Sequence, residues 1–340
     1  MASRIVLGMS STVDDEVVWD EQRVADLISE MGIGPHDLRS VGPVHDLRTM
    51  VATLVTHVAE GSGAEHYVTA PELLAEFVGR FESLRTLGGT GVRAGIALAA
   101  TGVASTAVMA AADPDVHRLL PPACRAVAAV EVPQLVPHLI VQYPAGATLQ
   151  VGDVTVVAPA PNRVIFAHDV PNERLDVPDV FPTLVADADV VLVSSLNAIR
   201  DPAVLAARLE QIGAALRGAP PAATVIWEDA GYHIGEYALL VTRAMAASAH
   251  VVSMNEDELQ AHLARRVDLL DAGAVARACA EARELVGART LVVHTRFWSL
   301  AVGDDAERYR AALRGGIAMA SARYAFGDGI GLEEYVEAGS

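Results

Sequence analysis

Val190-Val-Leu-Val-Ser194 is a short apolar segment that we predict to be a buried strand, and a helical pattern at 202–216 connects it to a second apolar strand, Ala223-Thr-Val-Ile-Trp227. The alternation continues to residue 294, with further strands at 250–254 and 290–294 and helices at 257–265 and 274–286. Apolar strands that alternate with helices are typical of a parallel sheet covered on both faces. We therefore predict an α/β fold, a three-layer sandwich with a mainly parallel central sheet.

A second pattern occupies residues 128–168. Short segments there alternate apolar and polar residues between turns, which predicts a small antiparallel sheet of strands at 139–143, 148–151, 154–157 and 163–166. Earlier in the chain, residues 21–60 and 71–84 are predicted to be mainly helical, and residues 10–16 to form a polar turn. We predict an α/β domain of residues 1–13, 71–125 and 171–340, and a discontinuous, β-rich lid domain of residues 14–70 and 126–170.

The chain of 340 residues carries a formal net charge of −18. A chain this acidic is expected to repel nucleic acid and anionic membranes. All 25 basic residues are arginine, and the absence of lysine excludes a phosphate-binding-loop lysine, a Schiff base with pyridoxal phosphate and a kinase-type strand lysine. Any phosphate must therefore be bound by arginine, backbone N–H groups or a metal ion.

The two cysteines, Cys124 and Cys279, are far apart in the sequence and fit neither a metal site nor a disulfide framework, so we expect a reduced, cytoplasmic protein. The chain begins with a predicted strand at 5–9 rather than a signal peptide. Residues 95–112 carry no charge, but they are rich in Gly, Ala, Ser and Thr. We predict a buried helix that ends near Gly102 and then a strand, rather than a membrane span.

Polar side chains follow several predicted strands, at the points where the strands end. Ligands bind at the carboxyl ends of the strands in sheets of this kind. Glu228 ends one strand, and the other candidates follow the next two strands: Asn255, Glu258, His294 and Thr295. Carboxylates and amides suit a Mg²⁺ site, but Asn255 with Glu258 three residues later equally predicts a helix capping box.

Near residue 328 the sequence contains Gly327-Asp328-Gly329, followed by a predicted helix start. Glycine N–H groups and a helix N-terminus bind anions, so the N–H groups of Gly327 and Gly329 are candidates for stabilising a phosphoryl group. Asp328 is then the candidate base that accepts a proton from a hydroxyl. The alternative interpretation is an ordinary Gly-Asp-Gly turn.

Two further segments suit sugar or phosphate binding. Gly88-Gly89-Thr90 precedes an Ala-rich helix but does not match the dinucleotide fingerprint, so we interpret it as a backbone cradle for a sugar or phosphate. Arg163 lies on the predicted lid, where an arginine can close on phosphates. The alternative for Arg163 is a surface arginine on a strand.

The order of these motifs resembles that of the ADP-dependent glucokinases and phosphofructokinases, a family of the ribokinase-like superfamily. The resemblance rests on Thr12-Val13-Asp14, Gly61-Ser-Gly63-Ala-Glu65, Leu87-Gly88-Gly89-Thr90, Asn162-Arg163-Val-Ile165, Glu228, Asn255 with Glu258, His294-Thr295 and Gly327-Asp328. Three positions depart from the family pattern: Ile226, Ala325 and Thr90 stand where the family has histidine, glycine, and glutamine or asparagine.

The resemblance implies a role for each of these residues. The acceptor would be bound by residues of the lid and of the Gly-rich turn: Asp14, Glu65, Gly88, Gly89, Thr90 and His168. The nucleotide would be bound by Arg163, Asn255, His294 and Thr295. Mg²⁺ would be served by Glu228, Asn255 and Glu258, and Asp328 would be the catalytic base.

We therefore expect a ribokinase-like sugar kinase that transfers the terminal phosphoryl group of ADP, with ATP as the alternative donor, to a hydroxyl of a sugar or similar polyol. Glu65 favours an unphosphorylated acceptor because a carboxylate repels a phosphate. One alternative is a non-catalytic sugar or nucleotide sensor on the same fold, favoured by Ile226 and Ala325. A kinase of sugar phosphates is another, and the protein is expected to be a monomer or a homodimer.

Overall fold

The computed structural model describes residues 4–39, 44–295, 297–327 and 329–339. The chain divides into two compact units: unit 1 comprises Met1–Ser11, Gly89–Pro133 and Pro171–Ser340, and unit 2 comprises Thr12–Gly88 and Gln134–Val170. Each unit has its own buried hydrophobic core. The chain passes from one unit to the other at 11/12, 88/89, 133/134 and 170/171.

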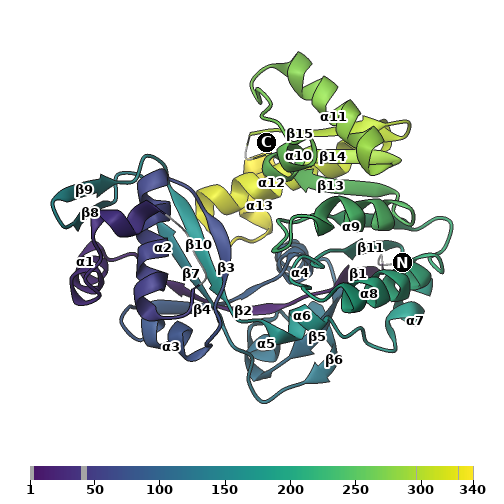
Figure 1. Ribbon diagram of the computed structural model, residues 1–340. Helices are drawn as coiled ribbons and strands as arrows, with labels where there is room; N and C mark the ends of the chain where they lie inside the picture. The colour runs from purple at the N-terminus through teal and green to yellow at the C-terminus, as the bar shows by residue number, and fades with distance from the viewer. Residues whose placement is uncertain (1–3, 40–43, 296, 328, 340) are drawn as a thin grey trace. The chain divides into compact units, whose positions relative to one another are not determined.

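Unit 1 is built on an eight-stranded sheet with the order β15-β14-β13-β12-β11-β1-β5-β6 (Figure 1). Neighbouring strands are parallel except for β15, which is antiparallel to β14, so the predicted mainly parallel sheet is confirmed. The strands are β1 (Ile5–Gly8), β5 (Ser105–Ala112), β6 (Cys124–Glu131), β11 (Val190–Val193), β12 (Thr224–Glu228), β13 (Val251–Asn255), β14 (Thr290–His294) and β15 (Ser299–Gly303).

Helices cover this sheet. Strands β13 and β14 are each buried at four consecutive positions, and such continuous burial requires cover on both faces. The helices are α4 (Thr90–Ala100), α5 (Pro114–Leu119), α7 (Phe181–Ala186), α8 (Pro202–Leu216), α9 (Tyr237–Ala246), α10 (Glu256–His262), α11 (Ala272–Val286), α12 (Arg310–Phe326) and α13 (Leu332–Gly339), with a 3₁₀ turn η2 (Ala306–Tyr309); α6 (Val170–Arg174) begins at the unit boundary.

Local sequence explains why these helices begin and end where they do. Asp201 caps α8 by accepting from the N–H groups of Ala203 and Val204, and Pro202 follows at the first helical position, where its missing N–H costs nothing. Helix α11 ends at Gly287, whose φ of 74° is readily adopted only by glycine. The sequence therefore specifies the helices of the α/β layer as well as its strands.

Unit 2 is built on a five-stranded mixed sheet with the order β3-β10-β7-β2-β4, and a separate hairpin of β8 and β9. Strand β10 is parallel to β3 and antiparallel to β7, and β2 is parallel to β7 and antiparallel to β4. The strands are β2 (Thr12–Val17), β3 (Ala64–Tyr67), β4 (Ser83–Gly88), β7 (His138–Tyr143), β8 (Thr148–Val151), β9 (Val154–Val157) and β10 (Asn162–Ala167).

The two faces of the five-stranded sheet differ. One face supplies the core of unit 2, including Val17, Leu139, Val141, Val164 and Phe166, and helices α1 (Glu21–Glu30), α2 (Leu47–Glu60) and α3 (Glu72–Val78) lie on this side (Figure 1). Because side chains alternate along a strand, the residues between them point to the opposite face. We call this second side the open face; it carries Asp14, Glu65, Gly88, His138 and Arg163.

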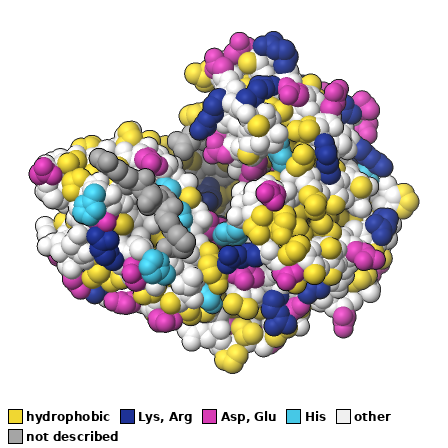
Figure 2. Space-filling view, viewed as in Figure 1, with side chains coloured by type: hydrophobic (Ala, Val, Ile, Leu, Met, Phe, Trp, Pro, Cys, Tyr) yellow, Lys and Arg dark blue, Asp and Glu magenta, His cyan; other side chains and the backbone are white. Residues whose placement is uncertain are grey.

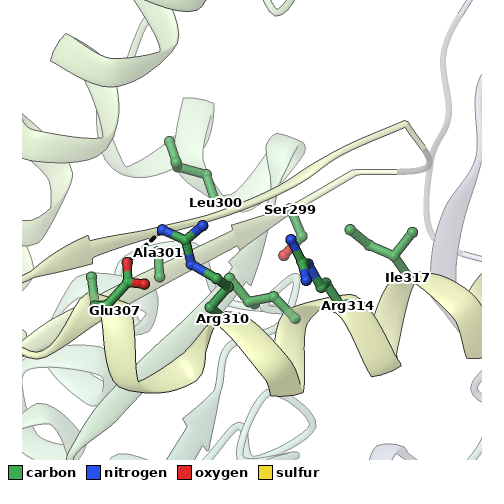
Figure 3. Close-up of a pocket in the computed structure, with 9 residues that line it drawn as sticks. Ser299, Leu300, Ala301, Glu307, Arg310, Arg314 and Ile317 are labelled. Atoms are coloured by element: carbon green, nitrogen blue, oxygen red, sulfur yellow. Dashed lines mark hydrogen bonds and ion pairs between the residues drawn. The ribbon is translucent and has the colours of Figure 1, made fainter.

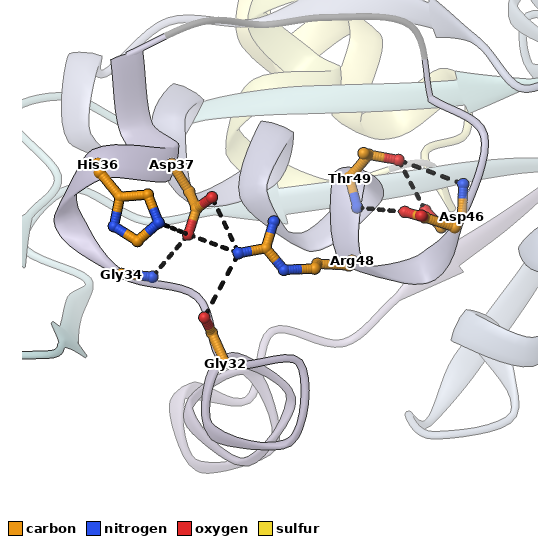
Figure 4. Close-up of polar contacts among 7 residues, drawn as sticks. All are labelled: Gly32, Gly34, His36, Asp37, Asp46, Arg48 and Thr49. Carbon is orange, nitrogen blue, oxygen red and sulfur yellow. Dashed lines mark hydrogen bonds and ion pairs between the residues drawn. The ribbon is translucent and has the colours of Figure 1, made fainter.

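Polar contacts fix the connection between the first two helices of unit 2. Arg48, in the first turn of α2, donates to both carboxylate oxygens of Asp37 in the 3₁₀ turn η1 (Pro35–Arg39), at 2.9 and 2.8 Å (Figure 4). Asp46 and Thr49 form a capping box at the start of α2, with the Thr49 N–H donating to Asp46 at 2.7 Å. The capping box satisfies a helix N–H group that has no partner within the helix, and the Arg48–Asp37 pair ties η1 to α2.

The structure corrects the predicted turn at 10–16. Residues 12–17 form β2, in which Val13, Asp15 and Val17 are buried and the intervening residues are half-buried. Asp15 is tolerated inside because Arg85, its partner on β4, donates to both of its carboxylate oxygens at 2.9 Å. The strand was not recognised in the sequence because its inward-facing residue Asp15 is charged and is paired with Arg85.

Other expectations for unit 2 also differ from the structure. The helix predicted over 71–84 ends at Val78, because Gly79 interrupts it and Ser83–Gly88 forms β4. The antiparallel sheet predicted within 128–168 is instead divided between the mixed sheet and the β8–β9 hairpin. Residues 71–88, predicted to be part of the α/β domain, belong to unit 2 through β4, and residues 126–133, predicted to be part of the lid, belong to unit 1 because β6 pairs with β5.

Acidic and arginine side chains are interspersed over the molecular surface seen in Figure 2, despite the net charge of −18. The helix at 90–100 and the strand at 105–112 confirm the predicted helix and strand of the uncharged stretch, although only Gly91, Val92 and Gly95 of this helix are buried. Among the described residues, every helix is too short or too polar to cross a bilayer.

Candidate functional site

Three predicted site residues end adjacent strands of unit 1. Glu228 ends β12, Asn255 ends β13 and His294 ends β14, and Asn255 and His294 are partners in the strand register. His294 Nε2 lies 3.0 Å from Glu228 Oε1, across the intervening strand. The sheet therefore brings these side chains together at the carboxyl ends of its strands, as their positions in the sequence predicted.

Asn255 and Glu258 form the capping box that was the alternative interpretation of this motif. The Asn255 side chain accepts from the N–H groups of Asp257 and Glu258 at 2.8 and 2.9 Å. Glu258 in turn accepts from the backbone N–H of Asn255 at 2.8 Å and from its side-chain amide at 2.9 Å. The motif thus begins α10, and the same contacts hold the Glu258 carboxylate beside the strand ends.

The strand-end cluster of Glu228, Asn255, Glu258 and His294 combines two carboxyl groups with one imidazole and one amide. Burial raises the pKa of Glu258 to about 7, the hydrogen bond from Asn255 opposes this, and the charges of Asp229 and Glu228 add to the rise. The hydrogen bond to Glu228 raises the pKa of His294, against the effect of burial. A cation placed here would relieve the repulsion between the carboxylates.

A buried pair beside this cluster was not among the predicted site residues. Asp229 follows Glu228 and accepts from the hydroxyl of Thr242 at 3.0 Å, and its other oxygen lies 2.6 Å from His262 Nε2. Both side chains of the pair are almost fully buried. The only signal for His262 in the sequence is its position four residues after Glu258. Its partner, Asp229, is 33 positions away in the chain.

The donors of the strand-end cluster suit Mg²⁺ only in part. Carboxylate and amide oxygens are the ligands that Mg²⁺ prefers, and the cluster offers both. However, Glu228 and Glu258 are engaged by His294 and Asn255, and in the described part of the chain no three His, Cys, Asp or Glu residues are placed to ligate a metal together. The residues therefore fit an ion that is held through water molecules rather than by direct ligands.

Beyond β14, Thr295 shapes the turn into β15. Its hydroxyl accepts from the N–H groups of Phe297 and Trp298, both at 3.0 Å. Ser299, which begins β15 and pairs with His294, also borders a groove of about 260 Å³ between β15 and α12. Arg310 and Arg314 project from α12 toward this groove, and Arg310 is bound to Glu307 (Figure 3).

The Gly-rich turn forms the start of α4. Gly89 is the N-cap residue, with φ of 89°, and a Cβ there would overlap the carbonyl oxygen of Ser10, so only glycine fits. Because glycine has no side chain to cap the helix, the first N–H groups of α4, beginning with exposed Thr90, have no side-chain acceptor at the cap. This supports the interpretation of a backbone cradle.

Asp328 lies outside the described residues, so its predicted role as base has no structural account. Its neighbour Gly327 ends α12, and the Gly327 N–H donates to the carbonyl of Arg323 at 2.9 Å. The Gly331 N–H, just before α13, donates to Glu334 at 2.8 Å. These two N–H groups are therefore already used, and Gly329 is the remaining predicted N–H donor of the turn.

In unit 2, the predicted acceptor residues Asp14, Glu65 and Gly88 share the open face with Arg163. Thr12 donates to the Asp14 carboxylate at 2.7 Å. A Cβ at Gly88 would overlap the Thr12 hydroxyl and the Asp14 carboxylate, so the glycine leaves room for these groups. Arg163 and Glu65 are exposed.

His168 follows β10 and is oriented by Val68, whose carbonyl lies 2.9 Å from His168 Nδ1, and by the ring of Tyr67, which stacks on it. The next residue, Asp169, pairs with His138, which the sequence analysis missed. His138 begins β7 and is the register partner of Asp14, a relation that only the strand pairing reveals.

The mainly parallel, helix-covered sheet of unit 1 is the α/β fold that was predicted as ribokinase-like. Solved structures of the same fold include an ADP-dependent phosphofructokinase from Pyrococcus horikoshii OT3, described as hypothetical, with a TM-score of 0.73 and 16% identity over 99% of this chain and 84% of that one. An ADP-dependent kinase in complex with fructose-6-phosphate and ADPβS gives a TM-score of 0.71 and 14% identity over 99% of this chain and 78% of that chain.

The conserved region of the ADP-specific phosphofructokinases and glucokinases matches residues 3–325, and the chain therefore belongs to this family. A curated relative, the ADP-dependent glucokinase of Bos taurus, is 25% identical over 206 residues, which cover 57% of this chain and 38% of the bovine protein. The family match includes all predicted site residues except Gly327, Asp328 and Gly329.

Proposed function

We propose that the protein is a sugar kinase that transfers the terminal phosphoryl group of ADP to a hydroxyl of an unphosphorylated sugar. The observation that carries this proposal is the family match over residues 3–325, which contains the strand-end cluster and the open-face residues. ADP is favoured because the family and the relatives described above are named for it. ATP remains the alternative donor.

We assign nucleotide binding to unit 1. His294, Thr295 and Asn255 lie at or just beyond the ends of β14 and β13, where an open α/β sheet binds its ligands. Glu228, Asn255 and Glu258 would hold Mg²⁺ through water, and bound Mg²⁺ would neutralise charge on the phosphates. His294 keeps the Glu228 carboxylate oriented, and Asn255 does the same for Glu258.

We assign binding of the acceptor sugar to unit 2. Asp14 and Glu65 are hydrogen-bond acceptors for sugar hydroxyls, and Gly88 leaves the Asp14 carboxylate free of steric hindrance from a side chain at that position. His168 adds an imidazole to unit 2. Gly89 and Thr90, at the start of α4 in unit 1, stay predicted N–H donors for a sugar or phosphate. Arg163 would stabilise phosphate charge during transfer, since its guanidinium suits phosphoryl oxygens.

Asp328 is the proposed base, which takes the proton of the attacking hydroxyl. Phosphorus NMR with ADP·Mg²⁺ and ATP·Mg²⁺ over hexoses, pentoses, nucleosides and aminosugars tests the activity without presuming the product. Asp328→Asn is expected to lower turnover at least about 1000-fold with nucleotide affinity nearly unchanged. Asp153→Asn, at an exposed turn of the β8–β9 hairpin, is the matched control. Full turnover in Asp328→Asn would place the base elsewhere.

The second candidate is a non-catalytic sugar or nucleotide sensor. It is favoured by the N–H groups of Gly327 and Gly331, because these donate to the Arg323 carbonyl and the Glu334 carboxylate and so already have acceptors within the chain. Calorimetric titration with ADP·Mg²⁺ and with each sugar separates the candidates. Binding without any transfer across the panel supports the sensor, whereas transfer from either donor excludes it.

A further inference from the structure

Asp229 is a buried aspartate that directly follows Glu228 at the carboxyl end of β12. Its backbone N–H still takes part in strand pairing, since it donates to the carbonyl of Ser253 on β13 at 2.8 Å. Its carboxylate has two side-chain partners. Oδ1 accepts from the Thr242 hydroxyl at 3.0 Å, and Oδ2 lies 2.6 Å from His262 Nε2. A carboxylate oxygen accepts, so His262 is the donor through Nε2.

The residues of this network come from three elements of unit 1. Asp229 follows β12, Thr242 lies on α9, and His262 is the last residue of α10. The side chains of Asp229 and His262 are 0% and 3% exposed, and Thr242 is fully buried. Apolar side chains of similar volume are often as stable as a buried polar pair, so stability alone does not account for these residues.

Helix α10 is held at both of its ends. It begins after Asn255, which ends β13 and caps the helix, and its last residue, His262, is bound to Asp229 beyond the end of β12. Glu258 lies between these two points, one turn before His262 and therefore on the same side of the helix. With seven residues the helix is only about 10 Å long, so a contact at either end affects the position of Glu258.

Asp229 also constrains the backbone that carries Glu228. The two residues are adjacent, and Glu228 pairs in register with Ser253, whose carbonyl accepts from the Asp229 N–H. The Glu228 side chain itself lies 3.0 Å from His294 Nε2. The carboxylate of Asp229 therefore joins the strand that carries Glu228 to the helix that carries Glu258.

We propose that Asp229 and His262 are positioning residues for Mg²⁺ binding, supported by Thr242. They set the distance between the carboxylates of Glu228 and Glu258. The inference rests on the proposed function, in which these two carboxylates hold the Mg²⁺ of the nucleotide through water. Each such water must reach both the ion and a carboxylate, so the separation of the carboxylates matters. Loss of the His262–Asp229 bond would let α10 move relative to β12 and weaken the binding of Mg²⁺ rather than that of the nucleotide itself.

The first test measures nucleotide binding and needs no turnover. Calorimetric titration gives the Kd for ADP·Mg²⁺ and, with EDTA present, the Kd for metal-free ADP. His262→Leu is expected to raise the Kd for ADP·Mg²⁺ at least about 10-fold, with the Kd for metal-free ADP changed less than about threefold. His262→Gln should stay within about threefold of wild type in both, because its amide N–H can donate to Asp229 in place of the imidazole.

His250→Leu is the matched control for the loss of a histidine from unit 1. His250 Nδ1 accepts from the Val225 N–H at 3.0 Å, just before β13 begins and so at the opposite edge of the same sheet. Both Kd values should stay within about threefold of wild type in this variant. The positioning role is overturned by an unchanged Kd for ADP·Mg²⁺ in His262→Leu, by an equal rise in both Kd values, or by the same pattern in His250→Leu.

A double-mutant cycle tests whether His262 acts through Glu258. Glu258→Gln should itself raise the Kd for ADP·Mg²⁺, and His262→Leu should add less than about threefold in that background. Effects that multiply in the double variant would mean that His262 acts independently of Glu258, which contradicts the inference.

Thr242→Val provides the test if His262→Leu does not fold. It removes the other side-chain donor to Asp229 and keeps the shape of the side chain, so the Kd for ADP·Mg²⁺ should rise at least about threefold with metal-free ADP unaffected. A wild-type Kd for ADP·Mg²⁺ in this variant would overturn the inference.

The binding measurements separate this inference from the kinase proposal. Absence of phosphoryl transfer to any sugar would refute the kinase, while the two Kd values would still decide the role of Asp229 and His262. Conversely, wild-type protein that binds ADP equally well with and without Mg²⁺ overturns the inference even if transfer occurs.

Discussion

Each unit of the protein places a histidine beside a carboxylate in a proposed site, and the two pairs differ in their surroundings. His294 and Glu228 in unit 1 are 3.0 Å apart with side chains 42% and 20% exposed, whereas His138 and Asp169 in unit 2 are 2.9 Å apart and 10% and 15% exposed. The distances are nearly equal, so burial distinguishes the pairs. The exposed pair can respond to a ligand, and the buried pair is part of the fold.

The largest effect is expected from breaking the buried pair. Asp169→Ala would leave the His138 imidazolium buried without its main partner, so the free energy of unfolding at pH 6 should fall by about 3–4 kcal/mol. Urea unfolding followed by circular dichroism measures this. The equivalent change in unit 1, Glu228→Ala, should cost less than about 1 kcal/mol because water reaches His294. Equal losses would show that burial does not distinguish the pairs.

The buried pair should also make stability depend on pH. The pKa of His138 is raised to about 9 in the folded protein, against about 6.5 in the unfolded chain. The stabilisation is therefore complete below about pH 6.5 and lost as the pH rises through about 9, a total of about 3 kcal/mol. The difference in unfolding free energy between wild type and His138→Gln, measured from pH 6 to pH 9.5, should shrink over this interval; a constant difference would refute the raised pKa.

The exposed pair should matter more for activity than for stability. Glu228→Gln removes charge from the strand-end cluster, and we expect kcat/KM for the nucleotide to fall about 100-fold, equivalent to about 2.7 kcal/mol, with a higher Mg²⁺ requirement. Initial rates over a Mg²⁺ titration test this, with Glu210→Gln on the exposed side of α8 as control. Unchanged rates at all Mg²⁺ concentrations would remove Glu228 from the proposed site.

The smallest effect concerns the capping box beside the exposed pair. Asn255→Ala removes the side chain that accepts from two N–H groups of α10, and the free energy of unfolding should fall by about 1 kcal/mol. Asp271 caps α11 in the same way but lies outside the proposed site, so Asp271→Ala is the control. If Asn255 only caps a helix, both variants keep full activity, and a selective loss of activity in Asn255→Ala supports its role at the nucleotide.

The α/β layer was largely predictable from sequence because its strands are apolar and its helices are periodic. The strand-end residues Glu228, Asn255 and His294 were found for the same reason, since each directly follows a clear strand. Unit 2 was harder. Strand β2 was hidden because the inward residue Asp15 is charged, and its neutralisation depends on Arg85, which lies 70 positions away.

The sequence analysis missed His138 and Asp169 for the same reason. His138 and Asp169 have no motif, and nothing in their local sequence shows that β7 lies beside β2 or that Asp169 reaches back to β7. The roles of Asp14, Glu65 and His168 were predicted from the resemblance to a family. The pair of His138 and Asp169 was recognised only from the strand register. Periodicity predicts elements, but pairing between distant strands requires the three-dimensional structure.

The discontinuous course of the chain has a consequence for how unit 2 forms. Strand β2 pairs with β7, and the contact between Glu16 and Gln142 on these strands joins residues 126 positions apart. Strand β3 pairs with β10, which comes much later in the chain. Closing such long loops is slow, because their entropy is lost before distant strands can pair. During synthesis, the early strands of unit 2 therefore stay unpaired at their edges until about residue 167 has emerged. Chaperones or rapid pairing of β2 with β4 would have to protect them from aggregation in that interval.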